Sequence, residues 1–215
     1  MTADAGRTIR RLVAASIAGL VLVLSAFFGG VALSAQQAPP STLSVEAGFA
    51  RDMQVHHQQA VEMSLMVRDS STDPAIRQLA YDIATTQAQQ AGQMHGWLSV
   101  WGLPQAPAEP AMTWMSRPTR HGSAHGHQPG AAAELGAAMP GMATSAQLSA
   151  LRDAEGADSE RIYLRLMIDH HRGGVEMAEA ALERTEEPVV LSLARAIVRS
   201  QKVEIVALQE LLAGR

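Results

Sequence analysis

The chain has no cysteine among its 215 residues. Disulfide bonds, thiolate metal sites and cysteine nucleophiles are therefore excluded. A soft metal ion bound through sulfur would need methionine thioethers instead, and the chain has 11 methionines.

The chain also has few aromatic residues and only a small net charge. Aromatics make up 4% of the chain, whereas Ala, Leu, Gln and Glu are abundant, which favours helices over sheet. The formal charge of −4 gives no reason to expect a nucleic-acid partner. With 47% hydrophobic residues, the chain can bury one good core or two small ones.

Charged residues are absent from residues 12–45, directly after Arg7, Arg10 and Arg11. This pattern predicts that residues 1–35 are a signal peptide or a membrane anchor and that residues 36–44 are a tether. The basic flank stays inside, so the rest of the chain should be exported, either secreted or held at the membrane.

A segment of about fifty residues occurs twice, displaced by 114 positions. The first copy contains Met, two residues, His-His, three residues and Val-Glu-Met from Met53 to Met63, and the second repeats this pattern from Met167 to Met177. The displacement also matches Pro74 with Pro188. The repeat predicts two structurally equivalent halves.

The apolar spacing predicts two helical hairpins, over residues 45–101 and 157–213. Turns before Pro74 and Pro188 separate the helices of each hairpin, and Asp73 is the expected cap of one of them. Residues 102–143, rich in Pro, Gly, Ala and Ser, are predicted to be a flexible linker, and 144–155 a short helix. Two hairpins joined by a long connection predict an all-α protein, a four-helix bundle. The linker also contains His121, His125 and His127, which leaves open whether it is a spacer or a weak metal-binding tract.

The repeated histidines and methionines share one helical face in each copy. At about 100° per residue, they fall within roughly one third of the helix circumference, together with apolar residues, so this face packs inward. We therefore predict that metal ligands come from Met53, His56, His57, Met63, Met167, His170, His171 and Met177.

Polar residues interrupt the apolar stripes of the partner helices at the level of the histidines. Counting from the turns places these residues opposite the His-His pairs, where they would either orient the imidazoles or bind the metal themselves: Thr86, Gln87, Gln90, Ser200, Gln201 and Glu204.

Several readings of the His/Met face remain open. Imidazole with thioether favours copper, above all Cu(I), although another transition metal is possible. A di-iron site would need Glu three residues before His, and neither pair has it. The alternatives are a structural or interaction bundle whose His and Met only pack, and a haem-binding electron carrier. No catalytic arrangement is visible, so we expect a binding protein and no enzyme.

The segment from Met167 to Met177 resembles the signature of the family called domain of unknown function 305. Met139-Pro-Gly-Met142 and the Trp97 to Gly102 segment are similar to it as well. The resemblance implies a ferritin-like four-helix bundle in exported bacterial proteins, some of them associated with copper binding and tolerance. By this match the eight His and Met residues carry over as ligands. Gln54-Val55 departs from the more usual residues before the first His-His pair, which implies a weaker first half-site.

Overall fold

The computed structural model describes residues 39–120 and 139–215, and these residues form helices and loops without a β-strand. The elements are the α-helices α2 (Val45–Ser70), α3 (Pro74–Val100), α4 (Ser145–Asp153), α5 (Gly156–Leu182) and α6 (Pro188–Ala213), and the short 3₁₀ helix η1 (Thr113–Ser116). The predicted all-α class is confirmed, and the helix bounds agree with the predicted hairpins.

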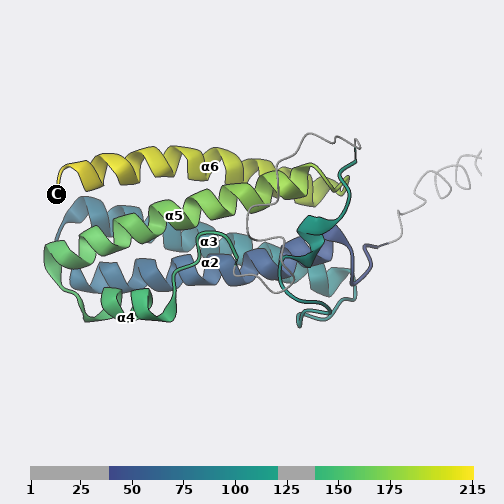
Figure 1. Cartoon of the computed structure of the whole chain (residues 1–215), viewed down its shortest axis with the longest axis horizontal. Helices are drawn as coiled ribbons and strands as arrows, with labels where there is room; N and C mark the ends of the chain where they lie inside the picture. Colours follow the sequence, from purple (N-terminus) through teal and green to yellow (C-terminus); the bar gives the residue numbers. More distant parts are fainter. Residues whose placement is uncertain (1–38, 121–138) are drawn as a thin grey trace, which may run out of the picture. The chain divides into compact units, whose positions relative to one another are not determined.

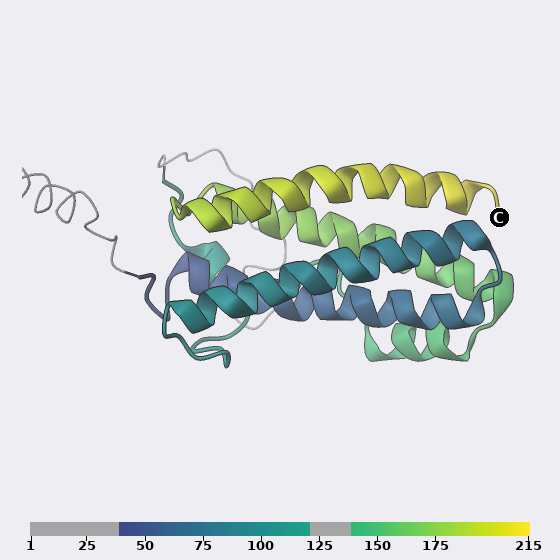
Figure 2. The same ribbon diagram turned by 180° about the vertical axis from the view of Figure 1, so that it is seen from behind.

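Four long helices lie side by side (Figures 1 and 2). Helices α2 and α3 form one antiparallel hairpin, α5 and α6 form the other, and the hairpins contact each other mainly through α2 and α5. The two central helices are antiparallel, because Ser70 at the end of α2 meets Ser159 near the start of α5, whereas Thr185 after α5 meets Glu46 at the start of α2.

Local sequence signals set the helix starts. Ser44 and Asp73 accept backbone N–H groups of the first turns of α2 and α3, so the expected Asp73 cap is present. Thr144 and Gln147 form a reciprocal capping box at α4. Pro188 opens α6, where its missing N–H leaves no bond unmade.

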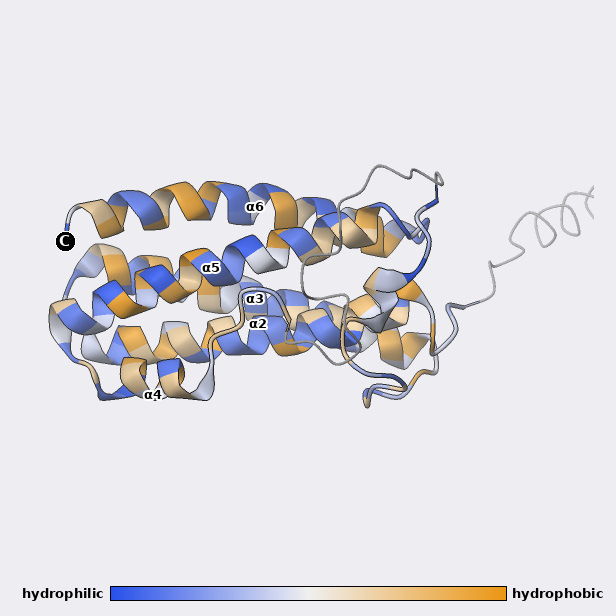
Figure 3. Cartoon of the chain, in the orientation of Figure 1, coloured by the Kyte–Doolittle hydropathy of each residue, from blue (hydrophilic) through white to orange (hydrophobic). Residues whose placement is uncertain are grey.

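Hydrophobic residues alternate with polar ones around each long helix (Figure 3). The buried side chains form two apolar clusters, one toward each end of the bundle. One includes Phe49, Met53 and Met177, and the other includes Met63 and Met167. The buried histidines belong to neither cluster and lie between them along α2 and α5.

Part of the predicted flexible linker packs against the bundle. Met112 and Trp114 are 1% exposed, and Phe49 meets the Trp114 ring edge-on at 5.7 Å between centroids. The buried carboxylate of Asp52 accepts hydrogen bonds from Met112 N at 2.7 Å and from Trp114 Nε1 at 2.9 Å. A flexible spacer therefore does not describe residues 103–120, because Asp52 and the apolar cluster hold them. Arg51 supports the same segment by donating to the carbonyl of Pro104.

Residues 1–38 and 121–138 lie outside the described part of the chain. The predicted signal peptide or anchor, residues 36–38 of the tether and the three linker histidines therefore stay predictions. Among the described residues, no helix combines the length and the apolar character needed to cross a membrane.

Candidate metal centre

All four repeated histidines are fully buried at the contact between α2 and α5. The rings of His56 and His170 meet across this contact, with 3.8 Å between their centroids and 35° between their planes. His57 and His171 lie outside this central pair, each 6.3 Å from the neighbouring ring of its own helix. The structure thus joins the two repeats in one histidine layer.

The outer histidines face the partner helix of their own hairpin. His57 Nε2 lies 2.8 Å from Gln90 Oε1, and His171 Nε2 lies 2.6 Å from Glu204 Oε2. Gln90 and Glu204 are equivalent in the repeat, so the turn-based register correctly placed both beside the histidines.

The inner histidines face backbone carbonyls. His56 Nε2 lies 3.0 Å from Pro140 O, and His170 Nε2 lies 2.9 Å from His56 O. The Pro140 carbonyl belongs to the segment 139–143, which the pair of bonds between the Gln59 amide and the Ala143 backbone also anchors. This segment lies so close to α5 that a Cβ on Gly173 would come within 2.0 Å of Pro140 O.

These contacts set one tautomer for all four rings. Each Nε2 faces an oxygen that only accepts, so each Nε2 carries the proton and donates it. The Nδ1 atoms then have free lone pairs, and all four are buried without a hydrogen-bond partner. A neutral imidazole whose N–H is held by an oxygen, with its other nitrogen free, is the arrangement that metal-binding histidines use.

Burial also keeps the rings of His56, His57 and His170 neutral. Desolvation lowers the pKa of His56 to about 4 and that of His57 to about 3, with nearby histidines adding to the shift. Desolvation likewise lowers the pKa of His170 well below its ordinary value. Neutral rings are the form that binds a metal ion.

The predicted methionine ligands flank the histidine layer on both sides. Met53 lies in one apolar cluster with Met177, and Met63 lies in the other with Met167. All four are fully buried. Because α2 and α5 are antiparallel, each cluster combines the first methionine of one repeat with the last methionine of the other.

The remaining predicted partners divide into two kinds. Gln87 and Gln201 are buried, and both polar atoms of each amide lack a hydrogen-bond partner. Gln201 lies against Gly174, where an added Cβ would come within 2.4 Å of its Oε1. Thr86 is exposed and Ser200 is half-buried and donates to the Ile197 carbonyl of its own helix, so in the described residues neither side chain bonds to the histidines.

The histidine and carboxylate side chains of this layer do not by themselves form a metal-binding site with three or more ligands. In residues 39–120 and 139–215, no group of three or more His, Asp or Glu side chains is arranged to hold a metal ion. A metal site in this layer would thus have to rely on a His-His pair with neighbouring thioether or amide groups.

The sequence of residues 46–212 matches the family model described as domain of unknown function (DUF305). The chain belongs to this family. The predicted resemblance is therefore confirmed. No curated protein matches the chain.

Solved structures extend the DUF305 comparison. A DUF305 protein of Streptomyces coelicolor, described as secreted, is 48% identical, with 80% of this chain and 93% of that chain covered and a TM-score of 0.68. A DUF305 fragment from Deinococcus radiodurans is 33% identical, with 82% and 100% covered and a TM-score of 0.63. CopM in its Cu(I)-bound form is 25% identical, with 80% and 96% covered and a TM-score of 0.57.

Proposed function

We propose that this DUF305 protein is an extracytoplasmic copper-binding protein that buffers Cu(I) or confers copper tolerance, without being an enzyme. The carrying observation is the set of four buried histidines, each with Nε2 bonded to an oxygen and Nδ1 unpaired. Plain packing would leave four desolvated nitrogens without compensation, and each unpaired buried polar atom costs roughly 1–3 kcal/mol.

Copper is favoured over harder metals by the ligand types. Neutral imidazole nitrogen and four buried thioethers offer soft donors, whereas carboxylates are represented in the layer by Glu204 alone. CopM has been solved with Cu(I) and with Cu(II) bound, which supports the same choice of metal.

The proposal places the site inside a ferritin-like four-helix bundle outside the cytoplasm. The antiparallel hairpins and the long connection between them support this topology. The basic flank and apolar run of residues 1–35 support export through a signal peptide or membrane anchor, as does the secreted description of the Streptomyces coelicolor protein.

The test is Cu(I) titration against a competing chelator with the His170→Gln/His171→Gln variant. Glutamine keeps bulk and polarity but removes imidazole coordination, so Cu(I) affinity should fall at least tenfold. His95→Gln, on the exposed face of α3, is the matched control and should leave the affinity unchanged. Melting of the apo-proteins separates ligand loss from misfolding. Unchanged affinity in the double variant, with both proteins folded, would return the histidine layer to core packing.

A further inference from the structure

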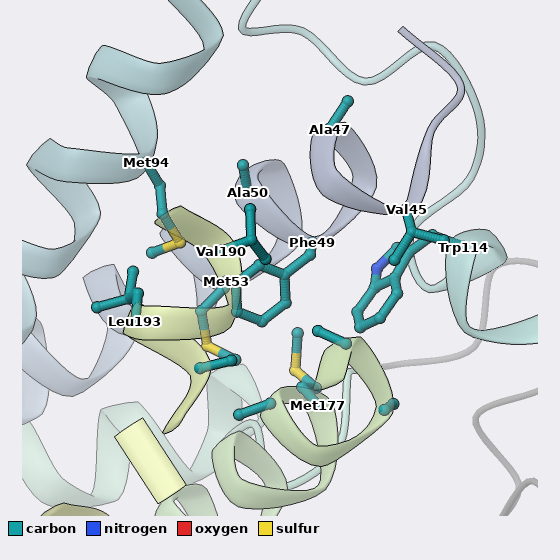
Figure 4. Close-up of a cluster of buried hydrophobic side chains, with 14 of the residues drawn as sticks. Val45, Ala47, Phe49, Ala50, Met53, Met94, Trp114, Met177, Val190 and Leu193 are labelled. Atoms are coloured by element: carbon teal, nitrogen blue, oxygen red, sulfur yellow. The ribbon is translucent and has the colours of Figure 1, made fainter. Parts of the chain in front are cut away.

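Methionines are concentrated at one end of the bundle, beyond those of the repeated motif. The apolar cluster there contains four methionines that are at most 1% exposed, which we call the methionine end cluster: Met53, Met94, Met112 and Met177. Met115 and Met139 pack against it from the surface. Figure 4 shows Met53, Met94 and Met177 extending into this cluster from three different helices.

The internal repeat supplies a control for what packing alone requires. Displacing Met94 by 114 positions gives Leu208, which is fully buried in the opposite cluster. Leu151 of α4 is buried at that opposite end, where Met112 has no methionine counterpart. Leucine thus fills the position at the other end that corresponds to Met94, and packing does not explain why a thioether occurs at this end.

Met112 is also held in an unusual conformation. Its φ of 66° makes it the one non-glycine residue with positive φ in the described residues. This conformation costs about 1–2 kcal/mol for a residue with a Cβ. The bond from Met112 N to Asp52 fixes it there and turns the residue into the cluster. The fold therefore retains a strained backbone where it places this thioether.

The surroundings of the cluster suit a monovalent cation. The buried Asp52 carboxylate, which binds Met112 N and Trp114 Nε1, supplies a negative charge beside the cluster. The Trp114 and Phe49 rings are buried in the same cluster, and aromatic rings attract cations. A buried charge of this kind compensates for the desolvation of a cation.

We propose that the methionine end cluster is a second soft-metal site, one that binds Cu(I) or Ag(I) through thioethers, with Met94 and Met112 as its distinguishing ligands. This proposal goes beyond the proposed function, because it assigns the protein a second bound ion in addition to the one at the histidine layer.

Silver titration of the full-length chain, labelled with ¹³C at the methionine methyl groups, tests this proposal. Ag(I) is the probe because it does not oxidise. The parent should bind two equivalents, and the methyl signals of Met94 and Met112 should shift. The Met94→Leu/Met112→Leu variant should lose one equivalent, or bind it at least tenfold more weakly. Leucine nearly conserves volume, so the fold should persist.

Two further variants separate this proposal from the proposed function. His170→Gln/His171→Gln should retain one equivalent with shifted Met94 and Met112 signals. Met66 packs against the opposite cluster, so the Met66→Leu variant should bind the same number of silver equivalents as the parent. Silver binding confined to the histidine layer, with Met94 and Met112 signals unmoved, would overturn the methionine site alone. A parent that binds no silver would overturn both proposals.

Discussion

Gly173 allows a quantitative test of how the segment 139–143 is held against the histidine layer. In a helix interior, Gly→Ala normally stabilises a protein by about 1 kcal/mol. At Gly173, however, the new Cβ would stand 2.0 Å from the Pro140 carbonyl oxygen and 2.3 Å from its carbon. Both Pro140 atoms belong to the backbone and cannot rotate away as a side chain would. The segment 139–143 therefore has to move by more than 1 Å before the contact reaches an ordinary distance.

That movement would break the 3.0 Å bond from His56 to Pro140 and strain the Gln59–Ala143 pair. Lost hydrogen bonds cost about 1 kcal/mol each, and overpacking typically costs about 1–3 kcal/mol. After subtracting the helix gain, Gly173→Ala should lower the free energy of unfolding by roughly 2–4 kcal/mol. For a chain of this size the melting temperature should fall by roughly 5–15 °C.

Gly92→Ala is the matched control, because it also lies inside a long helix and its Cβ would meet nothing within 4 Å. It should gain up to about 1 kcal/mol. Calorimetry and urea unfolding of both apo-variants give the comparison. If Gly173→Ala proves as stable as Gly92→Ala, Pro140 does not lie against α5, and the tautomer assigned to His56 loses its support.

Three other predictions concern the histidine layer and its surroundings. Because the folded-state pKa values of His56 and His57 are lowered, the unfolded chain binds more protons than the folded chain below about pH 6.5. The free energy of unfolding should therefore fall as the pH drops from there toward 4, by about 1.4 kcal/mol per pH unit for each ring. A free energy from urea unfolding that stays constant over this range would contradict the burial of both residues as neutral rings. Glu204→Leu removes the oxygen that orients His171, so chelator competition should show a roughly 10–100-fold loss of Cu(I) affinity. Glu204→Gln introduces the residue type of the equivalent Gln90 and should keep most of that affinity. Asp52→Ala leaves a backbone N–H and a tryptophan N–H buried without an acceptor, so the free energy of unfolding should fall by roughly 2–5 kcal/mol. Residues 103–120 should also become sensitive to protease, and the indole fluorescence should shift to the red. Unchanged protease resistance would show that apolar packing alone holds this segment.

The sequence predicted the parts of the fold that have helical periodicity. Apolar spacing and the cap at Asp73 were enough to place both hairpins, since these signals are local. The hairpin register also predicted that Gln90 and Glu204 lie beside the histidines. The same count included Thr86, which points outward because one residue changes the direction of a helical side chain by about 100°.

The contacts of the Pro- and Gly-rich segments were not predictable in this way. Met112, Trp114 and Pro140 reach the bundle from segments without helical periodicity, and their contacts span 60 residues or more in the chain. One signal was present: Asp52 lies on the inward face of a helix, where a carboxylate needs donors from elsewhere. An isolated tryptophan in a polar segment was the natural donor to look for.

The antiparallel packing of α2 and α5 changes how the repeat should be understood. Residues that match in sequence, such as Met53 and Met167, lie at opposite ends of the histidine layer, while Met53 shares its end with Met177. The repeat therefore makes the two ends of one histidine layer equivalent, with one methionine of each repeat at each end. Where the ends differ, as at Met94 and Leu208, the difference cannot come from the common fold. Such differences are where a function specific to one end has to be sought.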